Sequence, residues 1–369
     1  MSLYRFFRPL IFRLDPEKAH NLAIGFLKYF PNLANIFSLR CGYKSLQQDI
    51  CGLNFRSPVG LAAGFDKNGE AIRATSGFGF GFIEVGTVTP KAQDGNEKPR
   101  IFRLTEDRAI INRLGFNNKG AESLVKNISR LNFAKSSEGE VIENGKKRGK
   151  IICGVNIGKN KDTKDALEDY LPLMEKFYDK ASYITVNISS PNTKNLRDLQ
   201  DQDNLADFLH AIMVKKNELK KERDKETPIF LKIAPDLDLK QQENIAKIAM
   251  ESKVDGLIIS NTTISRPQLK SSYKDEVGGL SGKPLLEKSN EVLKNFYQLT
   301  KGEIPIIAVG GIFDANDAYL KIKLGASLVQ VYSALIYNGF SMVEKINKDL
   351  DSLLKKDGFS NVGQAVGSF

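Results

Sequence analysis

The sequence predicts an α/β protein, a single (β/α)8 barrel of the TIM type with a small helical extension at its N-terminus. From residue 53 onward, eight short apolar runs alternate with eight segments of helical periodicity, and eight such units close a barrel. The apolar runs are continuous, which is typical of parallel strands covered by helices. The length of 369 residues accommodates a barrel of about 250–300 residues and an appendage.

Each predicted strand is short, and a helical segment follows it before the next strand begins. The strands are expected at residues 59–63, 82–88, 150–157, 183–188, 228–234, 254–260, 304–310 and 328–332. The helices are expected at residues 70–76, 120–131, 163–179, 204–221, 239–251, 285–299, 316–324 and 341–355. A doubly wound open sheet is the alternative, but no G-x-G-x-x-G motif follows any of these strands.

Residues 1–42 are expected to form a separate helical segment, and residues 43–369 the barrel domain. Apolar residues recur in the first helix at helical spacing, with arginines on its other side. They are Leu3, Phe6, Phe7, Leu10, Ile11 and Leu14, opposite Arg5, Arg8 and Arg13. A second helix is expected from Pro16, because proline suits a first helical turn. Such a helix pair is typical of a segment lying in a membrane interface, and a hairpin packed on its own barrel is the alternative.

Composition excludes several classes of function. The net charge of +10 favours anionic partners or a lysine-rich surface, but no nucleic-acid-reading motif is present, so no nucleic acid partner is expected. Three scattered cysteines without C-x-x-C spacing argue against a disulfide framework, a zinc site or an iron–sulfur cluster. The only histidines are His20 and His210, too few for a histidine metal site or a catalytic triad. No metal site is therefore expected.

Three long connections interrupt the regular pattern. Residues 89–118 and 261–284 follow the second and sixth strands, so they are expected at the C-terminal face, where barrels place their active sites. Residues 134–150 are polar and contain glycine. We expect this third connection to be a mobile surface loop at the opposite face.

Residues 187–193, Asn-Ile-Ser-Ser-Pro-Asn-Thr, follow the fourth strand and carry amide and hydroxyl groups without any charge. Such a loop suits a neutral polar ring or proton transfer from carbon better than a phosphate or a metal. An ordinary turn that ends the strand is the alternative. No pair of acidic residues for glycosidase chemistry follows any strand.

The last two strand ends and two lysines point to a flavin nucleotide. Residues 308–312 and 331–334 present small residues and backbone N–H groups after strands seven and eight, where barrels commonly hold a phosphate. Glycines needed only for tight turns are the alternative. Lys67 and Lys232 follow or end strands one and five. A lysine beside the isoalloxazine can stabilise a reduced, anionic flavin, so the set suits flavin mononucleotide (FMN).

Nine ordered motifs resemble those of the dihydroorotate dehydrogenase family. They are AAGFDKNGE (62–70), FIEVGTVTP (82–90), RIFRL with INRLGFNN (100–118), VNISSPNT (186–193), LKIAPD (231–236), ISNTT (259–263), GGLSGKPL (278–285), AVGGI (308–312) and QVYSAL (330–335). The run DPEKAH at residues 15–20 is similar to the class 2, quinone-dependent branch. The resemblance implies a barrel with one FMN that oxidises dihydroorotate to orotate in pyrimidine synthesis.

The resemblance also implies roles for individual residues. It assigns FMN to Ala63, Gly64, Lys67, Thr87, Asn156, Asn187, Lys232, Ser260, Gly282, Gly311, Tyr332 and Ser333. It assigns the substrate to Lys67, Asn112, Arg113, Leu114, Gly115, Phe116, Asn187, Asn192, Asn261 and Thr262. Ser190 is the catalytic base by resemblance, where class 1 members carry a cysteine. A serine hydroxyl is a weak base, so Thr193, a water or the reduced flavin must help remove the proton.

In class 2 members the N-terminal helices admit a membrane quinone. By resemblance, Leu3, Phe6, Phe7, Leu10, Leu22 and Phe26 line its path, and His20, Arg103 and Tyr332 are its polar residues, although a structural role for His20 is an alternative. Residues 1–40 would give peripheral contact with the cytoplasmic side of a bacterial inner membrane. A class 1 enzyme, a dihydropyrimidine or dihydrouridine oxidoreductase, and a non-catalytic barrel that binds an anion or a membrane are the competing interpretations.

Overall fold

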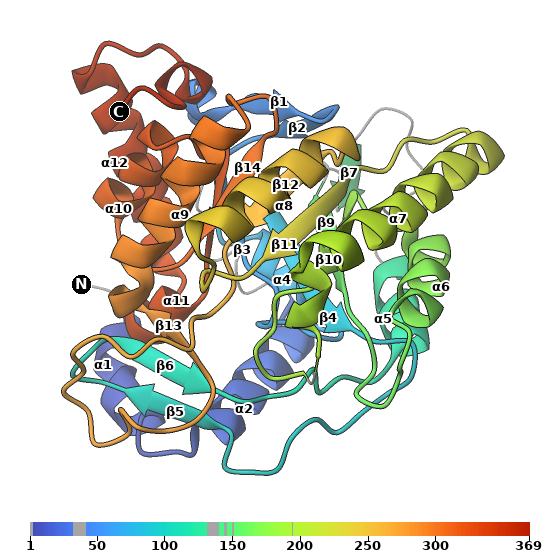
Figure 1. The fold of residues 1–369 in the computed structure, drawn as a ribbon. Helices are drawn as coiled ribbons and strands as arrows, with labels where there is room; N and C mark the ends of the chain where they lie inside the picture. Colours follow the sequence, from blue (N-terminus) through green and yellow to red (C-terminus); the bar gives the residue numbers. More distant parts are fainter. Residues whose placement is uncertain (1–2, 32–41, 131–139, 144–145, 150, 194) are drawn as a thin grey trace.

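The predicted closed barrel is confirmed in the computed structural model, which describes all residues except 1–2, 32–41, 131–139, 144–145, 150 and 194 (Figure 1). All eight barrel strands pair in parallel, in the order β10-β11-β12-β14-β15-β3-β4-β9. Their bounds are β3 (Val59–Leu61), β4 (Phe82–Val88), β9 (Ile152–Ile157), β10 (Tyr183–Asn187), β11 (Ile229–Ile233), β12 (Gly256–Ile259), β14 (Ile306–Val309) and β15 (Leu328–Val331).

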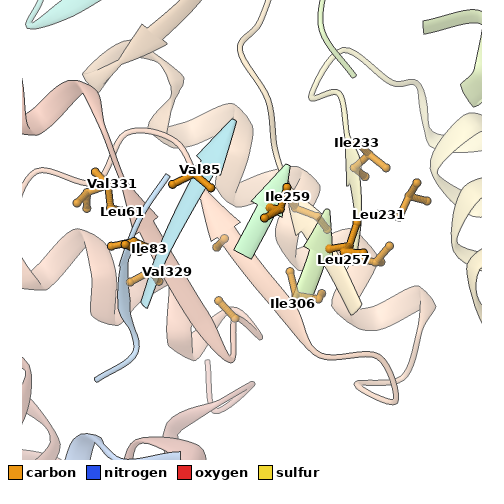
Figure 2. Close-up of a cluster of buried hydrophobic side chains, with 14 of the residues drawn as sticks. Leu61, Ile83, Val85, Leu231, Ile233, Leu257, Ile259, Ile306, Val329 and Val331 are labelled. Carbon is orange, nitrogen blue, oxygen red and sulfur yellow. The ribbon is translucent and has the colours of Figure 1, made fainter. Parts of the chain in front are cut away.

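Helices surround the barrel at the positions that the periodicity predicts. They are α4 (Ile72–Ser76), α5 (Ala121–Ser129), α6 (Leu167–Phe177), α7 (Gln202–Arg223), α8 (Leu239–Glu251), α9 (Leu286–Leu299), α10 (Ala315–Lys323) and α12 (Ser341–Lys356). One further helix, α11 (Ser333–Asn338), follows β15 directly and was not predicted. Between strands and helices lies a continuous apolar layer, part of which Figure 2 shows on neighbouring strands.

Aromatic side chains fill the barrel interior at the end where the strands begin. Polar groups occupy the end where the strands finish. The aromatic residues Phe82, Tyr183 and Phe230 are buried together with Phe55 from the hairpin of β1 (Gln48–Ile50) and β2 (Leu53–Phe55). Glycines on the neighbouring strands make room for the rings. A Cβ atom at Gly154, for example, would lie 2.1 Å from the Tyr183 ring. The functional site therefore has a rigid apolar floor.

The two insertions at the C-terminal face form a sheet that was not predicted. Strands β5 (Ile101–Leu104) and β6 (Ala109–Asn112) come from the first insertion, and β13 (Gly279–Gly282) ends the second. They pair antiparallel in the order β13-β6-β5. The sheet joins segments about 170 residues apart, which local sequence patterns do not reveal.

Both predicted N-terminal helices are present, α1 (Leu3–Ile11) and α2 (Pro16–Tyr29). Asp15 begins α2, since its carboxylate accepts a hydrogen bond of 2.9 Å from the Lys18 N–H. Helix α1 is fastened to α11 by the Tyr4 hydroxyl, which donates to the Ile336 carbonyl over 2.6 Å. Figure 1 shows α1 and α2 beside the β5–β6 sheet. No helix in the described residues has the length and apolar character to span a membrane.

The prediction of a loop at residues 134–150 was wrong in part. Strands β7 (Glu140–Glu143) and β8 (Lys146–Gly149) form an antiparallel hairpin there. Asn144-Gly145 is a strong hairpin signal in the sequence, which the overall polarity of this stretch obscured. The rest of the predicted loop lies outside the described residues.

Candidate active site

A cavity of about 1370 Å³ lies at the C-terminal end of the barrel and extends between α1 and α2. A single small-molecule pocket usually has about 300–1,000 Å³, so this cavity can hold more than one ligand. Most of the predicted site residues line it, and they come from distant parts of the sequence. They are His20, Ala63, Gly64, Lys67, Thr87, Arg103, Asn112, Leu114, Gly115, Phe116, Asn187, Ser190, Asn192, Lys232, Ser260, Asn261, Thr262, Gly282, Gly311, Tyr332 and Ser333.

Two predicted site residues do not line the cavity. Asn156 is fully buried behind Thr87, whose hydroxyl donates to the Asn156 side-chain oxygen over 2.5 Å. The Arg113 side chain turns away, because it forms an ion pair of 2.7 Å with Glu276 and lies over the Phe102 ring. Asn156 can therefore act through its neighbours, whereas the Arg113 guanidinium group does not reach the cavity.

Amide and hydroxyl groups at the ends of neighbouring strands form one hydrogen-bond network. The Asn187 side-chain amide donates to the Thr87 hydroxyl over 3.1 Å and to the Asn156 oxygen over 3.0 Å. The Ser189 hydroxyl donates to the Asn187 oxygen over 2.9 Å and accepts from the Asn261 amide over 3.0 Å. This network holds the amides of the cavity wall in fixed orientations, as recognition of a planar polar ring requires.

Glu84, which no sequence motif indicated as a site residue, lies below this network inside the barrel. Its buried carboxylate accepts hydrogen bonds from the Asn156 amide at 2.8 Å, the Tyr183 hydroxyl at 3.0 Å and the Gln330 amide at 2.8 Å. An acidic residue inside the continuous apolar strand FIEVGTV was the available signal. Glu84 thereby orients Asn156 beneath the cavity.

Lys67 and Lys232 line the cavity, Lys232 buried and Lys67 half-buried, and neither ammonium group has an ion-pair or hydrogen-bond partner among the described residues. Burial lowers the pKa of Lys67 to about 8, and it also lowers the pKa of Lys232. A buried cation is costly without a partner, so both lysines favour an anionic group in the cavity.

Hydrogen bonds hold the loop that carries Ser190 in place. The Ser190 hydroxyl oxygen accepts a hydrogen bond of 3.2 Å from the Asn192 N–H and faces the cavity. The buried hydroxyl of Thr193 has no hydrogen-bond partner among the described residues. Arg197 donates to the Ser189 carbonyl over 3.1 Å and holds the loop against its neighbours. The loop thus presents one hydroxyl to the cavity and keeps a second one free behind it.

Two glycines of the cavity wall, at the end of β13 and just after β14, have backbone conformations that favour glycine. Gly282 and Gly311 have φ values of +100° and +76°, which other residues rarely adopt. A Cβ atom at Gly311 would lie 2.4 Å from the Leu286 Cα, and one at Gly282 would lie 2.4 Å from the Arg108 carbonyl oxygen. Only glycine fits at either position, because a side chain there would collide with neighbouring backbone.

The outer part of the cavity is apolar and lies between α1 and α2. Of the residues predicted to line a quinone path, Phe7, Leu22 and Phe26 line the cavity. Phe6 and Leu10 do not line it and are instead 83% and 67% exposed on the outer surface. The Leu3 side chain lies outside the described part of the chain. Three of the residues predicted for the path therefore line the cavity, and Phe6 and Leu10 belong to an exposed apolar surface.

The three polar residues predicted for this path all line the cavity. Burial lowers the pKa of His20 to about 3, so its ring, which packs edge-on against Phe65, is neutral. Arg103 donates to the Leu14 carbonyl and so fastens the link between α1 and α2. The Tyr332 hydroxyl lies 3.4 Å from the Gly64 carbonyl oxygen, to which it donates.

Comparison with known proteins decides the family. The family profile described as "Dihydroorotate dehydrogenase" matches residues 45–354. A protein named dihydroorotate dehydrogenase (quinone) from Novosphingobium aromaticivorans is 45% identical over 368 residues, which is 100% of each chain. The chain belongs to the dihydroorotate dehydrogenase family.

Other dihydroorotate dehydrogenases agree over nearly the whole length. A protein named dihydroorotate dehydrogenase (quinone) from Acinetobacter baumannii is 46% identical over 346 residues, covering 93% of this chain and 98% of its own. The crystal structure of DHODH from Eimeria tenella in complex with ferulenol has a TM-score of 0.86 and 40% identity. It covers 96% of this chain and 95% of its own. The resemblance noted in the sequence is thereby confirmed.

Proposed function

We propose that this chain is a quinone-dependent dihydroorotate dehydrogenase, which oxidises dihydroorotate to orotate and passes the electrons to a quinone. The observation that carries the proposal is one cavity that joins Ser190 and Lys67 to an apolar opening between α1 and α2. A polar inner end suits dihydroorotate, and an apolar outer end suits a quinone. The names of the bacterial relatives support the same activity.

One FMN is the proposed cofactor, and the residues of the cavity fit it. Lys232 offers the cavity a cation without an ion-pair partner among the described residues, and Gly282 and Gly311 line the cavity without side chains, as close approach of a phosphate to the backbone requires. FMN, when bound, supplies a hydride acceptor that can pass electrons on one at a time. Thr87 and Asn187 offer hydrogen-bonding groups for the polar edge of the ring system.

The proposed substrate site lies around Lys67 and the amides. Lys67 pairs with the carboxylate of dihydroorotate, and Asn187, Asn192 and Asn261 hold the edge of its ring. Lys67 disfavours neutral pyrimidines, because such ligands leave its charge in the cavity without a partner. The backbone of residues 112–116 closes the other side of the ring.

Ser190 is the proposed base. It removes a proton from C5 of dihydroorotate while the hydride leaves C6, so a C5–C6 double bond forms and orotate results. The hydroxyl of Thr193 is the proposed next acceptor of this proton, because it lies buried on the same loop and has no hydrogen-bond partner in the described part of the chain. The serine in place of a cysteine supports class 2, which uses a quinone, over a class 1 enzyme that uses fumarate or NAD.

The membrane contact is proposed to involve residues 1–40, with residues 1–42 as its own segment and residues 43–369 as the catalytic domain. Exposed apolar side chains gather on α1 and α2, where Phe6, Leu10, Leu22 and Tyr29 are each more than half exposed. Such a surface is typical of a segment that lies in a lipid interface. We place the enzyme peripherally on the cytoplasmic side of a bacterial inner membrane, where quinones are available.

An anaerobic titration tests the proposed function. The purified protein is expected to show a flavin spectrum that dihydroorotate bleaches and a long-chain quinone restores. A Lys67→Met variant is expected to keep the flavin and to need far more dihydroorotate for bleaching. A wild-type protein without flavin, or with a flavin that dihydroorotate leaves oxidised, would refute the proposal and favour a non-catalytic barrel.

A further inference from the structure

A buried ion pair connects α2 with the segment that precedes β5. The Arg100 guanidinium group donates to the two carboxylate oxygens of Glu17 over 3.0 and 2.7 Å. Both side chains are buried, and hydrogen bonds from Arg100 lower the pKa of Glu17. A bidentate pair of this kind has a narrowly defined geometry. Arg100 is therefore held in place by the N-terminal helical segment.

Arg100 in turn holds the loop beside the proposed substrate site. Its remaining amino group donates to the carbonyls of Asp94 and Asn96, both at 2.6 Å. The Asn96 side chain donates to the Arg113 carbonyl over 3.0 Å and to the Asn192 carbonyl over 3.4 Å. A continuous series of hydrogen bonds thus runs from α2 to Asn192.

Close packing leaves this loop little freedom to move independently. A Cβ atom at Gly95 would lie 2.2 Å from the Leu114 carbonyl oxygen, and one at Gly115 would lie 2.8 Å from the Asn96 side chain. The Asn192 amide donates to the Asn112 carbonyl over 3.1 Å. A displacement of Asn96 therefore changes the segments on both sides of the substrate ring.

We infer that Glu17 and Arg100 are positioning residues for the dihydroorotate site, so the N-terminal segment organises substrate binding as well as quinone access. This inference rests on the proposed function. It makes Glu17 part of the first half-reaction, although α2 supplies no group that contacts the proposed substrate ring. The alternative is that the ion pair only fastens α2 to the barrel.

The test uses the full-length holoenzyme and a Glu17→Gln variant. Orotate affinity is measured from the change in flavin absorbance, and the rate of flavin reduction from anaerobic stopped flow. Glu17→Gln is expected to weaken orotate binding about tenfold, within the usual range for coupled sites. The limiting rate at saturating dihydroorotate is expected to change less than about twofold, because the variant leaves the proposed base Ser190 in place.

Two comparisons separate positioning from simple fastening. Lys28→Gln removes another ion pair of α2, at 2.8 Å to Glu70, which does not lead to Asn192, so it is expected to keep the wild-type affinity. Asn96→Ala combined with Glu17→Gln is expected to weaken binding little more than either change alone, because both interrupt the same connection. Glu17→Asp, which keeps the charge, is expected to be intermediate and serves if the glutamine variant loses its flavin.

Three results would overturn the inference. One is unchanged orotate affinity in the Glu17 variants, another is an equal loss in Lys28→Gln, and the third is strict additivity with Asn96→Ala. Any of these leaves the proposed function intact. A wild-type flavin that dihydroorotate does not reduce would instead refute the proposed function, and this inference with it.

Discussion

Ser190 is the residue on which the proposed proton transfer depends. It lies in the cavity on a loop fixed by Arg197, and its removal leaves Lys67 and the amide network in place. A Ser190→Ala variant is therefore expected to bind FMN and orotate normally and to reduce its flavin about 10²–10⁴-fold more slowly. Anaerobic stopped flow measures this rate. A near-normal rate would remove Ser190 from the role of base.

The lowered pKa of Lys67 predicts how orotate affinity depends on pH. Its pKa is lowered by burial to about 8, so the charge that attracts the orotate carboxylate is present below this pH and lost above it. Orotate affinity is expected to be constant near pH 7 and to fall by up to tenfold per pH unit above about pH 8. Lys67→Met should bind weakly without this dependence. Wild-type affinity that stays constant to about pH 9 would contradict the assigned contact.

At the scale of elements, α1 and α2 combine two roles on two faces. The inner face packs on β5 and α11 and lines the cavity, and the outer face exposes apolar side chains. Leu10, which is 67% exposed and does not line the cavity, offers a clean test of the outer face.

A Leu10→Glu variant is expected to lose most of its binding to lipid vesicles, because it places a charge in the apolar surface. Vesicle flotation measures binding, and flavin reduction by dihydroorotate is expected to be unchanged. Val214→Glu on α7 changes a partly exposed apolar residue elsewhere and is expected to bind as wild type. Equal flotation of all three proteins would show that the helices only pack on the barrel.

The aromatic floor of the barrel predicts a loss of stability on enlarging one glycine. A methyl group at Gly154 would lie 2.1 Å from the Tyr183 ring, so Gly154→Ala is expected to cost about 1–3 kcal/mol of unfolding free energy. Gly25→Ala in α2, where a methyl group meets nothing within 4 Å, is the control and should be neutral or stabilising. Denaturant unfolding compares them, and equal stability of both variants would contradict the packing described.

At the scale of the whole molecule, the repeating pattern of the barrel was predictable, and the contacts between insertions were not. The barrel strands are buried and predominantly apolar, so their positions follow from local chemistry. The β13–β6 pairing joins residues about 170 positions apart, and nothing local encodes it. For the same reason the Glu17–Arg100 pair was missed, whereas motifs such as VNISSPNT led directly to cavity residues.

The directions of the side chains at the site could not be predicted from the sequence either. Arg113 lies within a motif whose neighbours line the cavity, yet its guanidinium group pairs with Glu276 on the second insertion. In the sequence, Glu84 is one acidic residue within an apolar strand. Its role is visible only in the structure, where donors from three other strands surround its carboxylate. Both cases depend on tertiary neighbours.

The central claim is that one cavity links dihydroorotate oxidation at its inner end to quinone reduction at its apolar opening. Sequential-mixing stopped flow tests it most directly: dihydroorotate first reduces the bound flavin, and a quinone, fumarate or NAD⁺ is then added. We expect rapid reoxidation by the quinone and slow or no reoxidation by fumarate or NAD⁺. Reoxidation by fumarate or NAD⁺ as fast as by the quinone would contradict it.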